Sequence, residues 1–212
     1  MRHSVLTAVL ASGLVAASAV HSNDALAAGA RYGAGDIFTR FGVAKVTPKS
    51  DNGTLSNGAI DVDVQSDSAA AFTLGYRFTD KLGVELLAAQ RFEHDIELNG
   101  VNQASTKHLP PTLTLQYYPL GGTEARVQPY AGLGVNYTTF SDEKVDGSTL
   151  ELDDSWGAAG QVGVDLVIDD HWALNAAAWY LDIDTDAKVG GSDAGTVEID
   201  PVVVMGGLSY RF

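Results

Sequence analysis

The chain has 212 residues, a formal net charge of -14, 45% apolar residues and no cysteine. Its acidity argues against a nucleic-acid-binding surface, which must neutralise phosphates. The missing cysteines exclude thiol catalysis, disulfides and thiolate metal sites. Because the mean hydropathy is close to zero, the chain is too apolar to be disordered despite its charge. We therefore expect a folded, acidic protein with no nucleic-acid partner.

The amino terminus has the pattern of a secretory signal peptide. A basic start at Met1-Arg2-His3 precedes an apolar run from Val5 to Val20, and Ala25-Leu26-Ala27 supplies a cleavage site. The alternative is a membrane anchor, which needs about 20 apolar residues and does not normally end in such a motif. We expect residues 1–27 to be removed and residues 28–212 to form the mature domain outside the cytoplasm.

Beyond residue 27 the apolar residues alternate with the period of β-strands, and no run reaches the length of a spanning helix. Phe72, Leu74 and Tyr76 share one face of a strand, while Thr73 and Gly75 share the other. Segments of this kind are typical of membrane β-barrels, although a soluble sandwich also alternates. Eight can be drawn: residues 36–47, 68–79, 81–93, 106–118, 126–140, 155–168, 171–183 and 196–212.

The connections between these segments favour the barrel over the sandwich. Long linkers alternate strictly with short ones, as the extracellular loops and periplasmic turns of outer-membrane barrels do. Stretches around the long linkers, residues 48–67, 93–105, 141–154 and 182–200, carry net charges of -3, -3, -5 and -5. We therefore expect an all-β fold: an eight-stranded antiparallel transmembrane β-barrel with up-and-down topology and long acidic extracellular loops.

Aromatic residues gather near both ends of the predicted strands, as in the interfacial girdles of membrane barrels. One girdle would contain Tyr76, Phe78, Tyr117, Trp172, Tyr210 and Phe212, and the other Phe92, Tyr137, Phe140, Trp156 and Tyr180. The terminal Phe212 is also similar to the assembly signal of outer-membrane proteins. The expected partners are therefore the outer-membrane assembly machinery, outer-membrane lipids and lipopolysaccharide.

Several segments resemble the signature motifs of the OmpW family of outer-membrane proteins. They are His108–Leu113 (HLPPTL), Pro129–Phe140 (PYAGLGVNYTTF), Asp154–Gly160 (DSWGAAG), Trp179–Thr185 (WYLDIDT), Gly83–Leu87 (GVELL) and the terminal Tyr210-Arg211-Phe212. The resemblance covers essentially all of residues 36–212 and departs mainly in the long loops. It implies a barrel in the bacterial outer membrane with a narrow apolar channel for uptake of small hydrophobic molecules.

The strand faces opposite the apolar ones would line the lumen. Near the short turns they carry charges that are expected to form a polar plug on the periplasmic side: Arg40, Arg77, Glu85, Asp165 and Arg211. Farther from these turns the predicted lining is apolar: Leu87, Ala89, Trp179, Val203 and Met205, with Gly132 and Gly134 leaving room. An apolar cavity of this kind suits a small hydrophobic ligand.

Leu87 and Trp179 are the largest of these apolar residues and are expected to form the constriction. They also match the family's channel residues by position within GVELL and WYLDID. The alternative interpretation is ordinary packing inside a small barrel. Pro110 and Pro111 predict a weak point in one wall, because proline cannot donate to a strand ladder. A ligand stopped by the plug could leave sideways there, unless the prolines mark a simple bend.

Other chemistry is weakly supported. Asp182-x-Asp184-x-Asp186 has the spacing of a calcium loop, but Ala187 and Asp193 replace its essential glycine and glutamate. We expect no metal, no cofactor and no catalytic site, and hence no enzyme. The alternatives are a structural or receptor-like barrel acting through its loops, a small lipid-modifying membrane enzyme, and a soluble periplasmic barrel.

Overall fold

The computed structural model describes residues 30–49, 52, 54–55, 60–89, 92–98, 101–109, 111–145 and 150–212. The predicted signal peptide, residues 1–27, lies outside these ranges. In the described part of the chain the regular elements are fifteen β-strands. Within these ranges there is also no helix with the length and hydropathy needed to cross a membrane.

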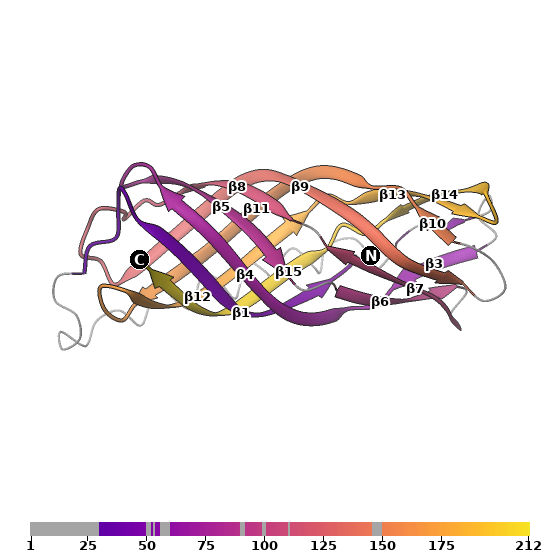
Figure 1. Ribbon diagram of the computed structural model, residues 1–212, viewed down its shortest axis with the longest axis horizontal. Coiled ribbons are helices and arrows are strands. Elements are labelled where there is room, and N and C mark those ends of the chain that lie inside the picture. The colour runs from indigo at the N-terminus through magenta and orange to yellow at the C-terminus, as the bar shows by residue number, and fades with distance from the viewer. Residues whose placement is uncertain are drawn as a thin grey trace, which may run out of the picture.

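Eight of the strands close into an antiparallel barrel (Figure 1). Each strand pairs with the next in the chain order given below, and the last pairs with the first. This confirms the predicted all-β, up-and-down barrel of eight strands. Two of the predicted segments, 106–118 and 196–212, begin too early, because each also includes the end of a preceding strand; their barrel strands start at Thr112 and Val202. The strands are β1 (Ile37–Thr47), β4 (Asp67–Arg77), β5 (Leu82–Ala89), β8 (Thr112–Tyr117), β9 (Val127–Val145), β11 (Ser155–Val167), β12 (Trp172–Leu181) and β15 (Val202–Arg211).

The segments predicted as long loops contain strands of their own. These strands gather at one end of the barrel, which we call the loop end, opposite the carboxyl terminus (Figure 1). β6 pairs with β7, and β13 pairs with β14. The short turns at 78–81, 118–126 and 168–171 mark the other end, the short-turn end. The loop-end strands are β2 (Thr54–Leu55), β3 (Ile60–Val64), β6 (Phe92–Leu98), β7 (Val101–Leu109), β10 (Leu150–Leu152), β13 (Asp184–Val189) and β14 (Ser192–Glu198).

The outer face of the barrel wall is apolar and exposed. On β4, Phe72, Leu74 and Tyr76 are about half exposed. Thr73 and Arg77, which face the other way on the same strand, are buried. Leu133 and Trp156 are 76% and 72% exposed. Side chains of this kind on the outside of a closed sheet indicate a surface made for lipid rather than water.

Seven of the predicted girdle aromatics follow this pattern, and Tyr137 and Tyr210 are half-buried. Tyr76, Phe78, Tyr117, Trp172 and Phe212 are exposed toward the short-turn end, and Trp156 and Tyr180 toward the loop end. Phe140, predicted in the second girdle, packs instead against the buried apolar cluster. It shares the inward face of β9 with Asn136 and Thr138, so strand phase overrides its position near a strand end. The side chain of Phe92 lies outside the described part.

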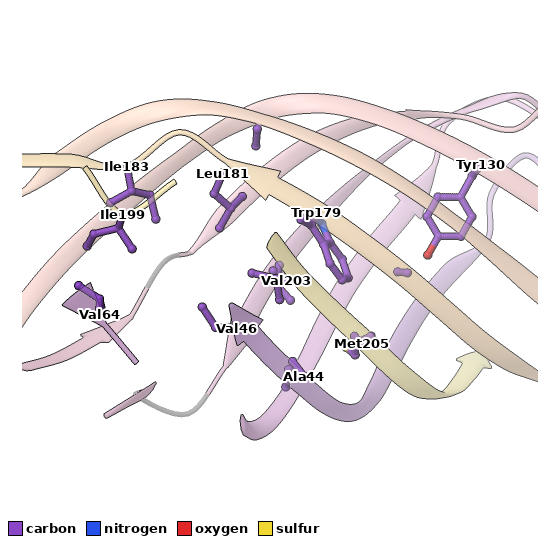
Figure 2. Close-up of a cluster of buried hydrophobic side chains, with 14 of the residues drawn as sticks. Ala44, Val46, Val64, Tyr130, Trp179, Leu181, Ile183, Ile199, Val203 and Met205 are labelled. Atoms are coloured by element: carbon purple, nitrogen blue, oxygen red, sulfur yellow. The ribbon is translucent and has the colours of Figure 1, made fainter. Parts of the chain in front are cut away.

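Buried apolar side chains form one cluster along the barrel interior, and this cluster continues between the loop-end strands. Figure 2 shows Tyr130 at one end of the series and Val64, Ile183 and Ile199 at the other. Between them lie Ala44, Val46, Trp179, Leu181, Val203 and Met205 (Figure 2). The core of this protein is therefore an apolar column along the barrel axis, which we call the apolar column.

Candidate functional site inside the barrel

A cluster of buried charges lies in the lumen on the short-turn side. Arg40 on β1 forms ion pairs with Glu85 on β5 and Asp165 on β11. Its Nε donates to Asp165 Oδ1 at 3.1 Å and its Nη2 to Asp165 Oδ2 at 2.6 Å, a two-pronged contact that fixes the guanidinium plane. All three side chains are almost fully buried. The structure thus brings together three of the residues predicted for the plug, and we call them the Arg40 cluster.

Neutral polar side chains complete the bonding of both carboxylates. Glu85 accepts hydrogen bonds from Thr73 Oγ1 at 2.9 Å, Gln116 Nε2 at 3.0 Å and Gln161 Nε2 at 2.7 Å. Asp165 accepts a further one from Asn175 Nδ2 at 2.8 Å. Buried ions are tolerated when they are paired and hydrogen-bonded in this way. These inward-facing side chains turn the ion pairs into a network that spans the lumen.

Tyrosine rings connect the Arg40 cluster to Arg77. The Arg40 guanidinium lies 4.3 Å from the ring centroid of Tyr130, and Arg77 lies 3.6 Å from that of Tyr118. The two tyrosine rings are 5.4 Å apart. Arg77 is buried, as predicted for its strand face, but its contacts are cation–π rather than an ion pair with Glu85 or Asp165. The roles of Tyr118 and Tyr130 did not emerge from the sequence, because strand alternation does not distinguish one inward-facing tyrosine from another.

The structure separates Arg211 from the Arg40 cluster. Its Nη1 donates to the Asp36 carboxylate at 3.2 Å and to the Arg31 carbonyl at 2.6 Å, and its Nε to the Asp170 carbonyl at 2.7 Å. Since Arg211 is the last residue of β15, it lies at the rim of the barrel. The prediction that placed it in the same charged layer is corrected on this point.

Residues 30–36 cross the short-turn end as a strap, which the sequence analysis did not anticipate. The Tyr32 carbonyl accepts from Gly122 N at 2.8 Å, and the Tyr32 hydroxyl donates to the Asp169 carbonyl at 3.2 Å. Ala34 N donates to Asp80 Oδ1 at 3.0 Å. The strap therefore contacts all three short turns. The sequence of residues 30–36 shows no strand periodicity. The one signal for the strap is the large ring of Tyr32 ahead of the first strand.

The predicted channel-lining residues lie within the apolar column. Leu87, Trp179, Val203 and Met205 are all at most 4% exposed and belong to one buried cluster. Trp179 on β12 pairs with Val203 on β15, and Ala177 pairs with Met205 two residues closer to the short turns. The side chain of Ala89 lies outside the described part of the chain.

The lumen glycines do not leave the empty space that was expected. A Cβ at Gly132 would lie 3.1 Å from Gln161 Oε1, and one at Gly134 would lie 1.9 Å from the Leu113 carbonyl oxygen. Both glycines therefore allow neighbouring groups to approach closely. At these two glycines neighbouring groups occupy the space, so a ligand there must displace them.

A groove of about 640 Å³ lies on the outer wall. Most of its lining is apolar and faces outward, and a Cβ added at Gly160 would meet open space. Its lining includes Leu115, Tyr117, Ala131, Leu133, Val162 and Tyr180. The groove therefore belongs to the apolar outer face of the barrel.

One wall of the barrel has an interrupted ladder. The pairing of β5 with β8 ends at Leu87 and Thr112, and the pairing of β6 with β7 begins at Phe92 and His108. Pro111 lies between these ladders, and its carbonyl accepts a hydrogen bond from Tyr137 N of β9 at 3.0 Å. Among the described residues, Pro111 is therefore bonded to β9, but it takes part neither in the pairing of β5 with β8 nor in that of β6 with β7. Pro110 lies outside the described residues.

Acidic side chains converge at the loop end, but only two of the three come from the calcium-loop spacing. One carboxylate oxygen each of Asp182, Asp184 and Asp200 lies within 4.8 Å of the others. Asp186 instead accepts a hydrogen bond from Thr196 Oγ1 at 2.8 Å. Lys49 donates to Asp200 at 3.2 Å. Burial and the two neighbouring carboxylates raise the pKa of Asp184.

Comparison with known proteins agrees with this architecture. Residues 33–212 match the family model described as the OmpW family. Outer membrane protein W of Vibrio cholerae is 42% identical over 194 residues, which are 84% of this chain and 89% of that protein. The crystal structure of the outer membrane protein OprG from Pseudomonas aeruginosa is 41% identical, with a TM-score of 0.79 over 86% of this chain and 98% of that chain.

A solid-state NMR structure of the outer membrane protein AlkL in lipid bilayers is also similar. It is 25% identical with a TM-score of 0.69, over 91% of this chain and 97% of that chain. The closed pairing, the exposed apolar wall and these matches agree with one another. The protein is therefore a β-barrel of the bacterial outer membrane, and the chain belongs to the OmpW family.

Proposed function

We propose that the protein is a passive outer-membrane channel for small hydrophobic molecules. The observation that carries this proposal is the apolar column, which runs from the loop end to the Arg40 cluster. The transfer of an apolar molecule from water to such surroundings is favourable. The relatives are named outer-membrane proteins, and none of those reported above is named an enzyme. In this proposal the acidic loop-end strands face the cell exterior.

The Arg40 cluster acts as the periplasmic plug. An apolar ligand that passed it would separate Arg40 from Glu85 and Asp165, and removing a partner from a buried ion pair costs about 3–5 kcal/mol. A hydrophobic ligand offers these ions no replacement hydrogen bonds. The strap at Tyr32 adds a second closure at the same end. Passage straight through to the periplasm is therefore disfavoured.

The interrupted wall beside Pro111 provides the lateral exit. Proline has no N–H, so Pro111 is bonded to β9 through its carbonyl alone. Toward β5, the pairing of the described residues stops at Leu87 and Thr112, so separating the strands here breaks fewer hydrogen bonds than elsewhere in the wall. Leu87 is the last β5 residue paired with β8 and also belongs to the apolar column. The column and the interruption are therefore adjacent. A ligand that displaces Leu87 and Trp179 can leave beside Pro111 into the bilayer.

Phe212 connects this function to assembly of the barrel. Its ring is 71% exposed and lies edge-on to Tyr210, with the ring centroids 5.1 Å apart. Its backbone N–H donates to the Ile37 carbonyl at 3.0 Å, so the chain end lies beside the barrel seam. We include recognition of this terminal aromatic by the outer-membrane assembly machinery in the proposal.

Two tryptophan substitutions on one strand test the channel. Ala177 faces the lumen and is buried, whereas Ala176 faces outward and is exposed. The measurement is uptake of the apolar dye N-phenyl-1-naphthylamine by intact cells that lack their own protein of this family. Ala177→Trp should reduce uptake to the rate of cells without the protein, and Ala176→Trp should retain it. Wild-type uptake by inserted, folded Ala177→Trp would contradict the channel.

If Ala177→Trp fails to insert, Ala177→Leu provides a smaller obstruction at the same position. Heat-dependent gel mobility of the outer-membrane fraction verifies folding of each variant. A graded loss of uptake from alanine to leucine is the expected result. Equal uptake by folded wild-type and Ala177→Leu protein, together with unaffected Ala176→Trp, would favour a barrel that acts through its loops.

A further inference from the structure

Trp179 carries a buried hydrogen-bond donor that has no partner. Its side chain is 1% exposed, and its indole Nε1 makes no hydrogen bond. Leaving a buried N–H unpaired is unfavourable, and most such groups in native proteins are paired. The atom therefore needs an explanation, and its position in the predicted constriction suggests that a ligand supplies the acceptor.

The polar neighbour of Trp179 cannot serve this donor. Gln161 lies opposite Trp179 in the pairing of β11 with β12. Gln161 Oε1 already accepts from Thr114 Oγ1 and Gln116 Nε2, both at 2.8 Å, and its Nε2 donates to Glu85. An amide oxygen has two acceptor sites, so this one is saturated. The hydrogen-bond network around the Arg40 cluster thus offers no acceptor to the indole N–H.

The other neighbours that the structure describes for Trp179 on β15 and in the buried cluster are apolar. Val203 pairs with Trp179 across the strands, and Met205 and Leu181 belong to the same buried cluster. Figure 2 shows Trp179 between Leu181 and Met205 along the column, near Val203. One unpaired donor therefore faces a column that otherwise recognises only apolar surface.

We propose that Trp179 selects apolar ligands that carry one neutral hydrogen-bond acceptor, such as the oxygen of a ketone, ether or alcohol. This inference rests on the proposed channel function and names the ligand class. A hydrocarbon leaves the indole N–H unpaired, whereas a carbonyl oxygen pairs it while the alkyl chain occupies the column. A carboxylate is excluded, because one N–H and apolar walls do not compensate an ion for lost hydration.

The discriminating experiment compares two ligands of the same shape. 2-Nonanone and 2-methyl-1-nonene differ only in that a carbonyl oxygen replaces a terminal methylene group. Each is titrated into the full protein in lipid nanodiscs, and the Met205 methyl resonance reports occupancy of the column. At equal mole fraction in lipid, the ketone should bind about tenfold more tightly than the alkene. This factor corresponds to the net contribution of one hydrogen bond.

The indole N–H resonances report the proposed bond directly. The chain has three tryptophans, and Trp156 and Trp172 are exposed on the outer wall, so they provide internal controls for partition into lipid. The ketone should move the Trp179 indole proton downfield with the same saturation as Met205. The alkene should perturb Met205 without that downfield shift.

Trp179→Phe keeps an aromatic ring but removes the donor. Its preference for the ketone should fall to about equal affinity, whereas Trp172→Phe should retain the tenfold preference. If both ligands saturate Met205 with equal affinity in wild-type protein, the donor proposal is wrong and the channel proposal stands. If neither ligand perturbs Met205 or Trp179 in folded protein, both proposals fail.

Discussion

Arg40 and Asp165 pair across the barrel lumen from strands that are not neighbours. β12 and β15 lie between their strands on one side of the barrel, yet two nitrogens of Arg40 contact the two oxygens of Asp165. With Glu85 on β5, the contact braces three parts of the wall. The same ion pairs that close the lumen in the proposed function therefore also hold its shape.

Removing only the cation should destabilise the barrel strongly. Arg40→Met leaves Glu85 and Asp165 buried without a counter-ion, so the free energy of unfolding should fall by about 3–5 kcal/mol. Urea unfolding in detergent, followed by tryptophan emission, measures this loss. The matched control is the triple variant Arg40→Met, Glu85→Gln and Asp165→Asn, which should recover much of it. Equal stability of Arg40→Met and wild type would refute the role of this cluster.

Restoring a donor in the interrupted wall should hinder lateral exit. Pro111→Val, alone or with Pro110→Val, adds N–H groups to this wall, and the one at residue 111 lies on the side of its carbonyl and can bond to Tyr137 of β9. Dye uptake by intact cells should fall toward the rate of cells without the protein. Pro129→Val places the same change in the paired wall of β9 and should leave uptake unaltered. Undiminished uptake by the folded double variant would remove the exit from this position.

The acidic cluster at the loop end should make the β13–β14 hairpin sensitive to pH. Burial and the neighbouring Asp200 and Asp182 raise the pKa of Asp184 above its ordinary value of 3.8. When the pKa of a carboxyl is higher in the folded state than in the unfolded state, the folded state becomes less stable as the pH rises from the unfolded-state pKa through the folded-state pKa. Backbone amides of the hairpin should therefore exchange hydrogen faster at pH 7 than at pH 4, after correction for intrinsic rates.

Asp184→Asn should reduce this pH dependence, because the amide cannot ionise. Asp193→Asn makes the same chemical change on β14, where the side chain accepts from Gly195 N, and should preserve it. If the hairpin amides of Asp184→Asn and of wild type showed the same change in hydrogen exchange between pH 4 and pH 7, the pH dependence would not come from Asp184.

Much of the barrel could be predicted because alternation assigns a face to every strand residue. That rule placed Arg40, Glu85 and Asp165 inward, and their closeness followed from their similar distance to the short turns. It also explains the error at Phe140, where position near a strand end was weighed above strand phase. Alternation carries no information about a segment without a period, so the strap at Tyr32 escaped it.

The chemistry of the site was harder to predict than its lining. Whether Arg77 meets a carboxylate or a tyrosine ring depends on side-chain length and on the stagger of strands, which the sequence pattern does not specify. Gly132 and Gly134 suggested empty space because glycine lacks a side chain. The three-dimensional packing shows that neighbouring groups occupy that space.

The central claim is that hydrophobic molecules pass through the apolar column, and reversible blockage tests it most directly. Because the chain has no cysteine, Ala177→Cys and the outward-facing Ala176→Cys provide unique thiols on one strand. Both are treated with a small alkyl methanethiosulfonate, and dye uptake is measured before treatment, after it and after reduction. Uptake through the Ala177→Cys protein should stop on modification and return on reduction, while Ala176→Cys should not respond. Unchanged uptake after complete modification of Ala177→Cys, verified by mass spectrometry, would contradict the claim.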